Sequence, residues 1–159
     1  MQILKHVVEK NHALNADPGL KPDAGKLNEV LKQVSHLARH DCLVCLITDG
    51  SGINPETRRY ITRLAEHNDV LTAFIFDPLE KNIPAAGRLR FSDGDGQLDA
   101  DTSDKKLRTA FQNEFEQRLE QMRSASRRFS MPLLALDTCN PVSEQIRDAL
   151  GHHQGTKRF

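Results

Sequence analysis

The chain has 159 residues, of which 28% are charged and 38% hydrophobic, and its 22 Lys and Arg balance its 22 Asp and Glu. This length indicates one domain or part of one, and zero net charge excludes an overall basic footprint for nucleic acid or anionic lipid. No apolar run approaches the length of a membrane span. We therefore expect a globular protein that binds neither nucleic acid nor membranes. We also expect a cytoplasmic location, because the N-terminus lacks the basic-then-apolar build of a secretory signal.

Two amphipathic helices are predicted near the N-terminus, at residues 2–15 and 27–40. Both segments repeat apolar residues at intervals of three and four, which is the spacing of one helix face. Residues 17–23 separate them and contain two prolines and a glycine, so we expect a loop there.

An unbroken apolar run, Leu43–Ile47, is followed by Thr48, Asp49 and Gly50. Such a run predicts a strand buried on both faces, as in a parallel sheet covered by helices. Ligands of these sheets gather at the carboxyl ends of the strands, where Asp49 lies. Gly50 lets the backbone turn sharply there. The loop of Asp49, Gly50 and Ser51 is therefore the first candidate site.

Cys42 and Cys45 form a C-x-x-C pair, a spacing shared by many redox and zinc sites. Here the two residues lie in or beside the predicted strand and on opposite faces of it. No second cysteine pair completes a zinc site, and three cysteines give no disulfide framework. We interpret Cys42 and Cys45 as buried core thiols.

The next segments continue the alternation of helix and strand. Asn54 followed by Pro55 predicts an N-cap and the first position of a helix that extends to about Ala65. Residues 70–76 then form a second apolar run, which Asp77 and Pro78 end. This order is typical of α/β proteins with a parallel sheet.

Residues 88–98 differ from the rest, because two short segments flank a run of alternating acidic residues and glycines. This pattern predicts a β-hairpin with a glycine-permitted turn. Asp93, Asp95 and Asp99 resemble part of a calcium loop, but the glutamate that such a loop needs at its twelfth position is missing. We therefore predict a turn.

The C-terminal part is predicted to contain a long helix at 104–128, a strand at 133–136 followed by Asp137, and a helix at 141–150. Together the elements predict an α/β fold. Its core is a partial doubly wound parallel sheet of about three strands, with flanking helices and a small β-hairpin insertion.

Four segments in combination resemble a known bacterial family. They are Leu43–Asp49, Leu64–Val70, Asp77-Pro78-Leu79-Glu80 with Ile83–Gly87, and Asp101–Asp104. The chain resembles the von Willebrand factor A-like group associated with MoxR-type ATPases, catalogued as domain of unknown function number 58. The resemblance covers only the C-terminal half of that family's domain. It implies that residues 1–151 are the C-terminal part of a von Willebrand A-like domain and that 152–159 are a polar tail.

The resemblance also implies a place for a divalent ion at the upper edge of the sheet. Asp49 matches the aspartate after the family's fourth strand, but no Asp-x-Ser-x-Ser precedes it. The family's threonine falls near residues 23–27, which contain no hydroxyl residue and include Lys26. Because magnesium needs more than one well-placed anchor, we expect Asp49 to be a vestige of the metal site. We expect no cofactor, with Mg²⁺ bound only if residues outside this chain complete the site.

In the family's fold, the strand at 43–48 pairs with a strand from the preceding half of the domain. Without that partner, its free edge presents unpaired N–H and C=O groups. We therefore expect a marginally stable monomer, or a protein that pairs this open edge with itself or with another chain.

The leading hypothesis is a non-catalytic protein-interaction module. Its partner, by resemblance, is a MoxR-type AAA+ ATPase from systems that assemble or activate protein complexes. The expected interaction surface comprises the first strand-end loop and the next one, namely Asp49, Gly50, Ser51, Asp77 and Glu80. A turn alone explains Asp77 and Pro78 but leaves Glu80 without a role.

Two alternatives stay open. One is a truncated remnant without independent function. The other is an enzyme that uses Asp49 in phosphotransfer or hydrolysis. We disfavour the enzyme because Pro78 removes an amide donor where an anion needs one, and because the sequence contains no glycine-rich phosphate loop. The expectation is a protein without catalytic activity.

Overall fold

The computed structural model describes Lys5, residues 24–92 and residues 97–153. The helix expected at 2–15, the loop at 17–23, Asp93, Asp95 and most of the tail lie outside the described residues. The chain divides into two compact units, one of Met1–Pro22 with Ala85–Lys105 and one of Asp23–Pro84 with Lys106–Phe159. In the described residues, no helix is both long and apolar enough to cross a membrane.

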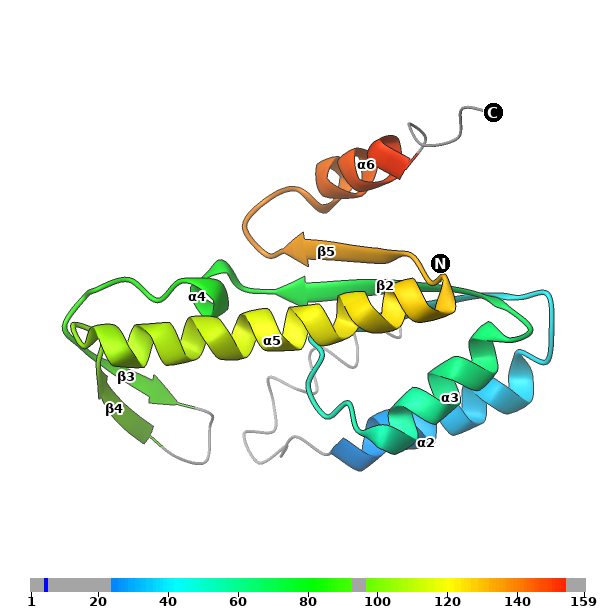
Figure 1. Cartoon of the computed structure of the whole chain (residues 1–159), viewed down its shortest axis with the longest axis horizontal. Coiled ribbons are helices and arrows are strands. Elements are labelled where there is room, and N and C mark those ends of the chain that lie inside the picture. The colour runs from blue at the N-terminus through cyan, green and yellow to red at the C-terminus, as the bar shows by residue number, and fades with distance from the viewer. Residues whose placement is uncertain (1–4, 6–23, 93–96, 154–159) are drawn as a thin grey trace. The chain divides into compact units, whose positions relative to one another are not determined.

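The larger unit contains a three-stranded parallel sheet in the order β1-β2-β5. Its strands are β1 (Leu43–Thr48), β2 (Asp69–Phe76) and β5 (Leu133–Asp137). Its helices are α2 (Ala24–Leu37), α3 (Pro55–Ala65), α4 (Pro78–Lys81), α5 (Lys105–Phe129) and α6 (Val142–His153) (Figure 1). The predicted α/β class, its parallel sheet and its flanking helices are confirmed.

The smaller unit contains the predicted hairpin, formed by β3 (Arg88–Ser92) and β4 (Gln97–Asp101) in antiparallel register. The exposed side chains of Arg90 and Asp99 form an ion pair across it, with Nε 2.7 Å from Oδ1. Thr102 closes the base of the hairpin, since its hydroxyl accepts from the amide of Ala86 at 3.0 Å and donates to the carbonyl of Gly87 at 2.8 Å.

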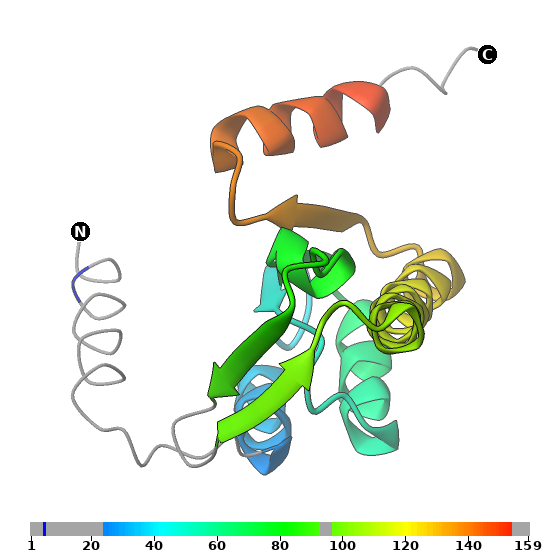
Figure 2. The same cartoon turned by 90° about the vertical axis from the view of Figure 1, so that its left-hand side faces the viewer.

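One face of the parallel sheet is covered by α2, α3 and α5 (Figure 2). Leu31 of α2 and Leu64 of α3 pack with Val70 of β2 in a buried cluster. Farther along the same face, the buried ring of Phe115 from α5 contacts Phe74, with 6.1 Å between the ring centroids. These contacts explain the apolar stripes of the helices, because each stripe faces the sheet.

The opposite face is covered only in part. Residues of α6 pack against the buried Leu134 and Leu136 of β5. On this face β1 presents Leu43 and Ile47, which are 72% and 70% exposed, and Cys45 between them is exposed as well. The prediction that β1 is buried on both faces is therefore wrong, because no described helix covers β1 on this side.

The same geometry corrects the interpretation of the C-x-x-C pair. Cys42 is half-buried and Cys45 is exposed, so neither is a core thiol. Both are free, as is Cys139. An apolar sequence placed Cys45 in the strand correctly, but which face of an edge strand is covered depends on residues far away in the sequence.

Strand β1 is an edge strand in the described part of the chain. Its six residues pair with β2 from Leu43 opposite Asp69 to Thr48 opposite Phe74, and no described strand pairs with its other edge. The predicted open edge is therefore present. An edge of this kind offers a row of backbone donors and acceptors for pairing with another chain.

Helix α3 begins as the sequence predicts. Asn54 is its N-cap, Pro55 occupies the first turn, and Thr57 completes a reciprocal capping box with Asn54. The fully buried hydroxyl of Thr57 donates to Oδ1 of Asn28 at 2.6 Å, while Nδ2 of Asn28 lies 3.1 Å from a carboxylate oxygen of Glu56. This polar network joins α2 to α3 and holds the loop after β1.

Candidate functional site

Each strand of the parallel sheet ends at an aspartate. Asp49 follows β1, Asp77 follows β2, and Asp137 is the last residue of β5. Because the strands are parallel, all three lie at the carboxyl edge of the sheet, where ligands of such folds gather. What these carboxylates contact decides whether they form a common site.

The first loop is held by short local hydrogen bonds. The exposed carboxylate of Asp49 accepts from the amide of Ser51 at 2.9 Å, and the Thr48 hydroxyl accepts from the amide of Gly50 at 3.0 Å. Gly50 has φ +77°, and a Cβ there would lie 3.0 Å from Cε2 of Phe74 and 3.3 Å from Cγ of Arg118. Only glycine fits this position without a shift of its neighbours.

The second loop forms a reciprocal cap around the short helix α4. Asp77 accepts from the amide of Leu79 at 2.8 Å, and Oε1 of Glu80 accepts from the amide of Asp77 at 3.1 Å. The other carboxylate oxygen of Glu80 forms an ion pair with Nη2 of Arg118. The turn interpretation of Asp77 and Pro78 therefore extends to Glu80, which both caps α4 and binds α5.

The carboxylate of the third aspartate, Asp137, is also hydrogen-bonded within its own loop. Oδ1 of Asp137 accepts from the amides of Cys139 and Asn140, each at 2.9 Å. The side chain of Asn140 donates to both carboxylate oxygens, and this hydrogen bond is the main cause that lowers the pKa of Asp137 below its ordinary value of 3.8. The side chain of Gln145 completes the loop. Its Oε1 accepts from the backbone amide of Asp137, and its Nε2 donates to the backbone carbonyl of Asp137.

The candidate residues thus form two local groups and not one cluster. No hydrogen bond in the described part of the chain joins Asp49 or Ser51 to Asp77 or Glu80. The link between the groups is Arg118, whose stem lies against Gly50 and whose guanidinium pairs with Glu80. Sequence reasoning missed Arg118, because nothing local marks a partner 38 residues away.

Arg118 has two further contacts. Its Cζ lies 6.0 Å from the ring centroid of Phe74 and 5.8 Å from that of Phe115, within the range of cation–π attraction. Its Nε is buried and has no hydrogen-bond partner among the described residues. Arg118 therefore connects the end of β1, the cap after β2 and the aromatic core under α5.

The residues at this edge do not fit a magnesium centre. Within residues 24–92 and 97–153, no group of three or more His, Cys, Asp or Glu side chains is placed to hold a metal ion. The carboxylate of Asp49 already accepts the backbone amide of Ser51. Hard cations such as Mg²⁺ need several oxygen ligands in near-octahedral geometry, which these residues do not supply.

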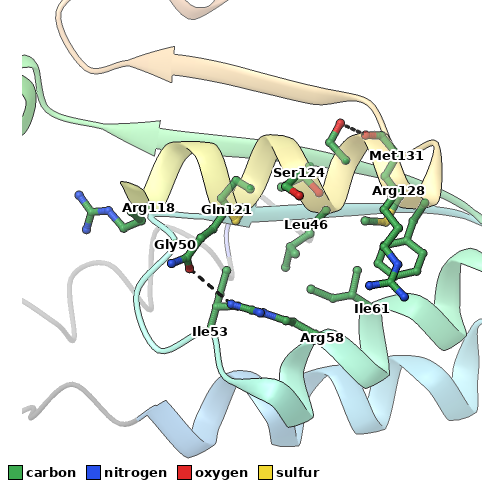
Figure 3. Close-up of a pocket in the computed structure, with 15 residues that line it drawn as sticks. Leu46, Gly50, Ile53, Arg58, Ile61, Arg118, Gln121, Ser124, Arg128 and Met131 are labelled. Atoms are coloured by element: carbon green, nitrogen blue, oxygen red, sulfur yellow. Dashed lines mark hydrogen bonds between the residues drawn. The ribbon is translucent and has the colours of Figure 1, made fainter. Parts of the chain in front are cut away.

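A cavity of about 240 Å³ lies beside this edge, between α3 and α5 and over the covered face of β1 (Figure 3). Gly50 and Arg118 line one end of it, and Phe129 and Met131 line it near the C-terminal end of α5. The cavity was not anticipated, because its walls come from three stretches that are distant in the sequence, namely residues 46–61, Thr72 and residues 118–131.

Comparison with known families adds the decisive observation. The family model described as Protein of unknown function DUF58 matches residues 1–130. The chain belongs to the DUF58 family. The DUF58 match includes all five candidate site residues and Arg118, whereas β5, Asp137 and α6 lie beyond it. No curated protein and no solved structure matches the chain.

Proposed function

We propose that this DUF58 chain is a non-catalytic protein-interaction module of the von Willebrand A-like type with an incomplete metal-ion-dependent adhesion site. Its proposed partner is a MoxR-type AAA+ ATPase that assembles or activates other protein complexes. The exposed face and open edge of β1 support an interaction surface, and the carboxylates at the strand ends are used in local hydrogen bonds. The partner and the von Willebrand A-like assignment rest on the sequence resemblance.

The proposal depends on one observation, which is that β1 has an exposed apolar face and an open edge. Leu43 and Ile47 are 72% and 70% exposed on one face, and the edge of the strand away from β2 has no described partner. An extended segment added to such an edge gains backbone hydrogen bonds, while exposed side chains of alternate positions supply specificity. Apolar side chains at the centre of a surface and polar ones around it are also the common anatomy of protein interfaces.

The loop after β1 supplies the polar border of the proposed surface. Asp49 and Ser51 are exposed, and their shared hydrogen bond together with Gly50 fixes the backbone of the loop. Asp77 is exposed at the end of the neighbouring strand, where the α4 cap holds it. A loop that is ordered before binding loses less conformational entropy on association.

An Asp49-dependent enzyme is the weaker alternative. A nucleophile or general base needs a partner that activates it, yet within the described residues the Asp49 carboxylate is hydrogen-bonded by the amide of Ser51. Asp77 is followed by Pro78, which has no amide donor for an anion. These features favour a structural use of both carboxylates.

The experiment is a calorimetric titration of the whole chain with a purified MoxR-type ATPase. Ile47→Lys places a charge on the exposed face of β1 and should weaken binding roughly tenfold or more. Leu37→Lys is the matched control, because Leu37 is 82% exposed on α2, and it should change the affinity less than about twofold. Failure of the unaltered chain to bind, or equal effects of the two variants, would refute the proposal.

The open edge has a second candidate occupant, which is another copy of this chain. Strands at an unprotected edge pair readily with identical strands, so self-association and partner binding compete for β1. Light scattering over a range of protein concentrations separates the two. If the chain is a monomer at every concentration, self-association through β1 is ruled out. A dimer that the Ile47→Lys substitution dissociates supports it.

A further inference from the structure

The cavity between α3 and α5 combines an apolar interior with basic residues. Its apolar lining comes from β1, the following loop, α3 and the end of α5, and includes Leu46, Ile53, Ile61, Met122, Phe129 and Met131. Figure 3 shows these elements enclosing one continuous space beneath α5. Small-molecule sites usually have this composition, with a few polar groups that fix the orientation of the ligand.

Three arginines line the cavity, namely Arg58 from α3 and Arg118 and Arg128 from α5, whereas no Asp or Glu of the described residues lines it. Arg118 is paired with Glu80, but Arg58 and Arg128 form no ion pair within the described residues. Arg58 donates only to the neutral amide oxygen of Gln121, at 3.4 Å. The guanidinium of Arg128 lies 5.3 Å from the ring centroid of its neighbour Phe129.

The two arginines approach the cavity from opposite walls. Figure 3 shows Arg58 running along the α3 side toward Gln121, and Arg128 descending from α5 toward Ile61. Positive charge with no carboxylate partner beside an apolar space attracts an anion, and a guanidinium binds carboxylates through paired N–H donors. The buried Nε of Arg118, which has no partner, adds an unused donor to the residues that line this space.

We propose that this cavity binds a small monocarboxylate with an apolar body of about five to seven carbons. The apolar body fills the space between Leu46 and Met122, and the carboxylate pairs with Arg58, whose guanidinium lies beside Gln121. At about 240 Å³ the cavity is smaller than most sites for drug-sized molecules, so it suits a small ligand. This ligand site is independent of the β1 surface, so either proposal can fail without the other.

The test is calorimetry on the whole chain with hexanoate as the probe and 1-hexanol and acetate as matched ligands. Hexanoate should bind roughly tenfold more tightly than 1-hexanol, because only the acid gains charge-assisted hydrogen bonds. Acetate should bind more weakly than hexanoate, since it leaves the apolar space unfilled. The proposal is overturned if hexanoate shows no binding at up to about 10 mM, or binds no better than 1-hexanol.

Variants locate the site. Arg58→Gln should lower hexanoate affinity about threefold to tenfold and leave 1-hexanol affinity unchanged, whereas Arg128→Gln, at the other end of the cavity, should lower hexanoate affinity less. Arg63→Gln on α3 and Arg123→Gln on α5 are the controls, because both arginines are exposed and neither lines the cavity. Ala125→Leu fills the cavity and should abolish hexanoate binding while the chain still unfolds cooperatively. Binding that survives Ala125→Leu, or equal effects of lining and control arginines, contradicts the proposal.

Discussion

Arg118 of α5 forms an ion pair with Glu80, the residue that also closes the cap at the end of β2. The pair connects two segments that are 38 residues apart in the sequence. Because the stem of Arg118 also lies against Gly50, this one side chain holds both candidate loops in place.

The first prediction concerns the energy of that pair. Glu80→Gln keeps an oxygen that can accept from Asp77 but removes the charge, and Arg118→Met keeps the apolar stem. A double-mutant cycle in urea should give a coupling of about 0.5–1 kcal/mol, a value discounted because both side chains are about a third exposed. The exposed pair of Arg127 and Glu120 is the control and should give a coupling near zero. Equal couplings would contradict the role assigned to Arg118.

The second prediction tests the tight approach at Gly50. Gly50→Ala should lower the free energy of unfolding by about 2 kcal/mol, from backbone strain and from the 3.0 Å approach of the new Cβ to Phe74. Gly87→Ala is the control, since Gly87 has the same φ of +77° but no atom within 4 Å of an added Cβ. Gly87→Ala should lower the free energy of unfolding by the cost of backbone strain alone, which is about 1 kcal/mol. If Gly87→Ala lowers the free energy of unfolding as much as Gly50→Ala or more, the contacts around Gly50 accommodate the added methyl group and the prediction is wrong.

The third prediction tests the polar network that joins α2 to α3. Thr57→Val removes the buried hydroxyl without changing the volume, so it breaks the cap of α3 and leaves Asn28 without its donor. The loss in stability should be about 1–3 kcal/mol in urea unfolding. Thr62→Val on the same helix removes only a local bond to Arg58 and should change stability by less than about 0.5 kcal/mol. If the two variants lose the same stability, the network between α2 and α3 does not stabilise the fold.

The fourth prediction concerns the pH dependence at Asp137. Hydrogen bonds from Asn140 lower the pKa of this carboxyl in the folded chain, so the ionised form is favoured by folding. The associated stability is present above the ordinary value of 3.8 and is lost as the pH falls through the lowered pKa. A carboxyl titration by NMR should give a pKa below 3.8 for Asp137, and Asn140→Ala should raise it toward that value. An unchanged pKa in the variant would assign the shift to another cause.

The elements that the sequence predicts well are those with a local cause. Asn54 and Pro55 cap α3 as expected, and the α/β order follows from the alternation of apolar patterns. The turn at Asp77 and Pro78 was recognised for the same reason, because the residues that Asp77 contacts follow it directly in the chain. Local hydrogen bonds and helix periodicity are encoded within a few residues.

The features that sequence reasoning missed depend on distant segments. The apolar run of β1 indicated burial, but coverage of its outer face requires a helix over Leu43 and Ile47, and no sequence pattern in β1 reports on that helix. Arg118 and the cavity were missed because α4, α5 and the loop after β1 meet only in the folded chain. The place for a divalent ion came only from the resemblance, and Asp49 was expected to be a vestige of that site.

Amide hydrogen exchange of the whole chain with and without a MoxR-type ATPase tests the central claim most directly. If the open edge of β1 is the interaction surface, exchange should slow at residues 43–51 when the ATPase is added, while β5 at the opposite edge of the sheet stays unchanged. The protection should disappear in Ile47→Lys and persist in Leu37→Lys. ATPase binding that leaves residues 43–51 unprotected, or that protects β5 equally, would contradict the account.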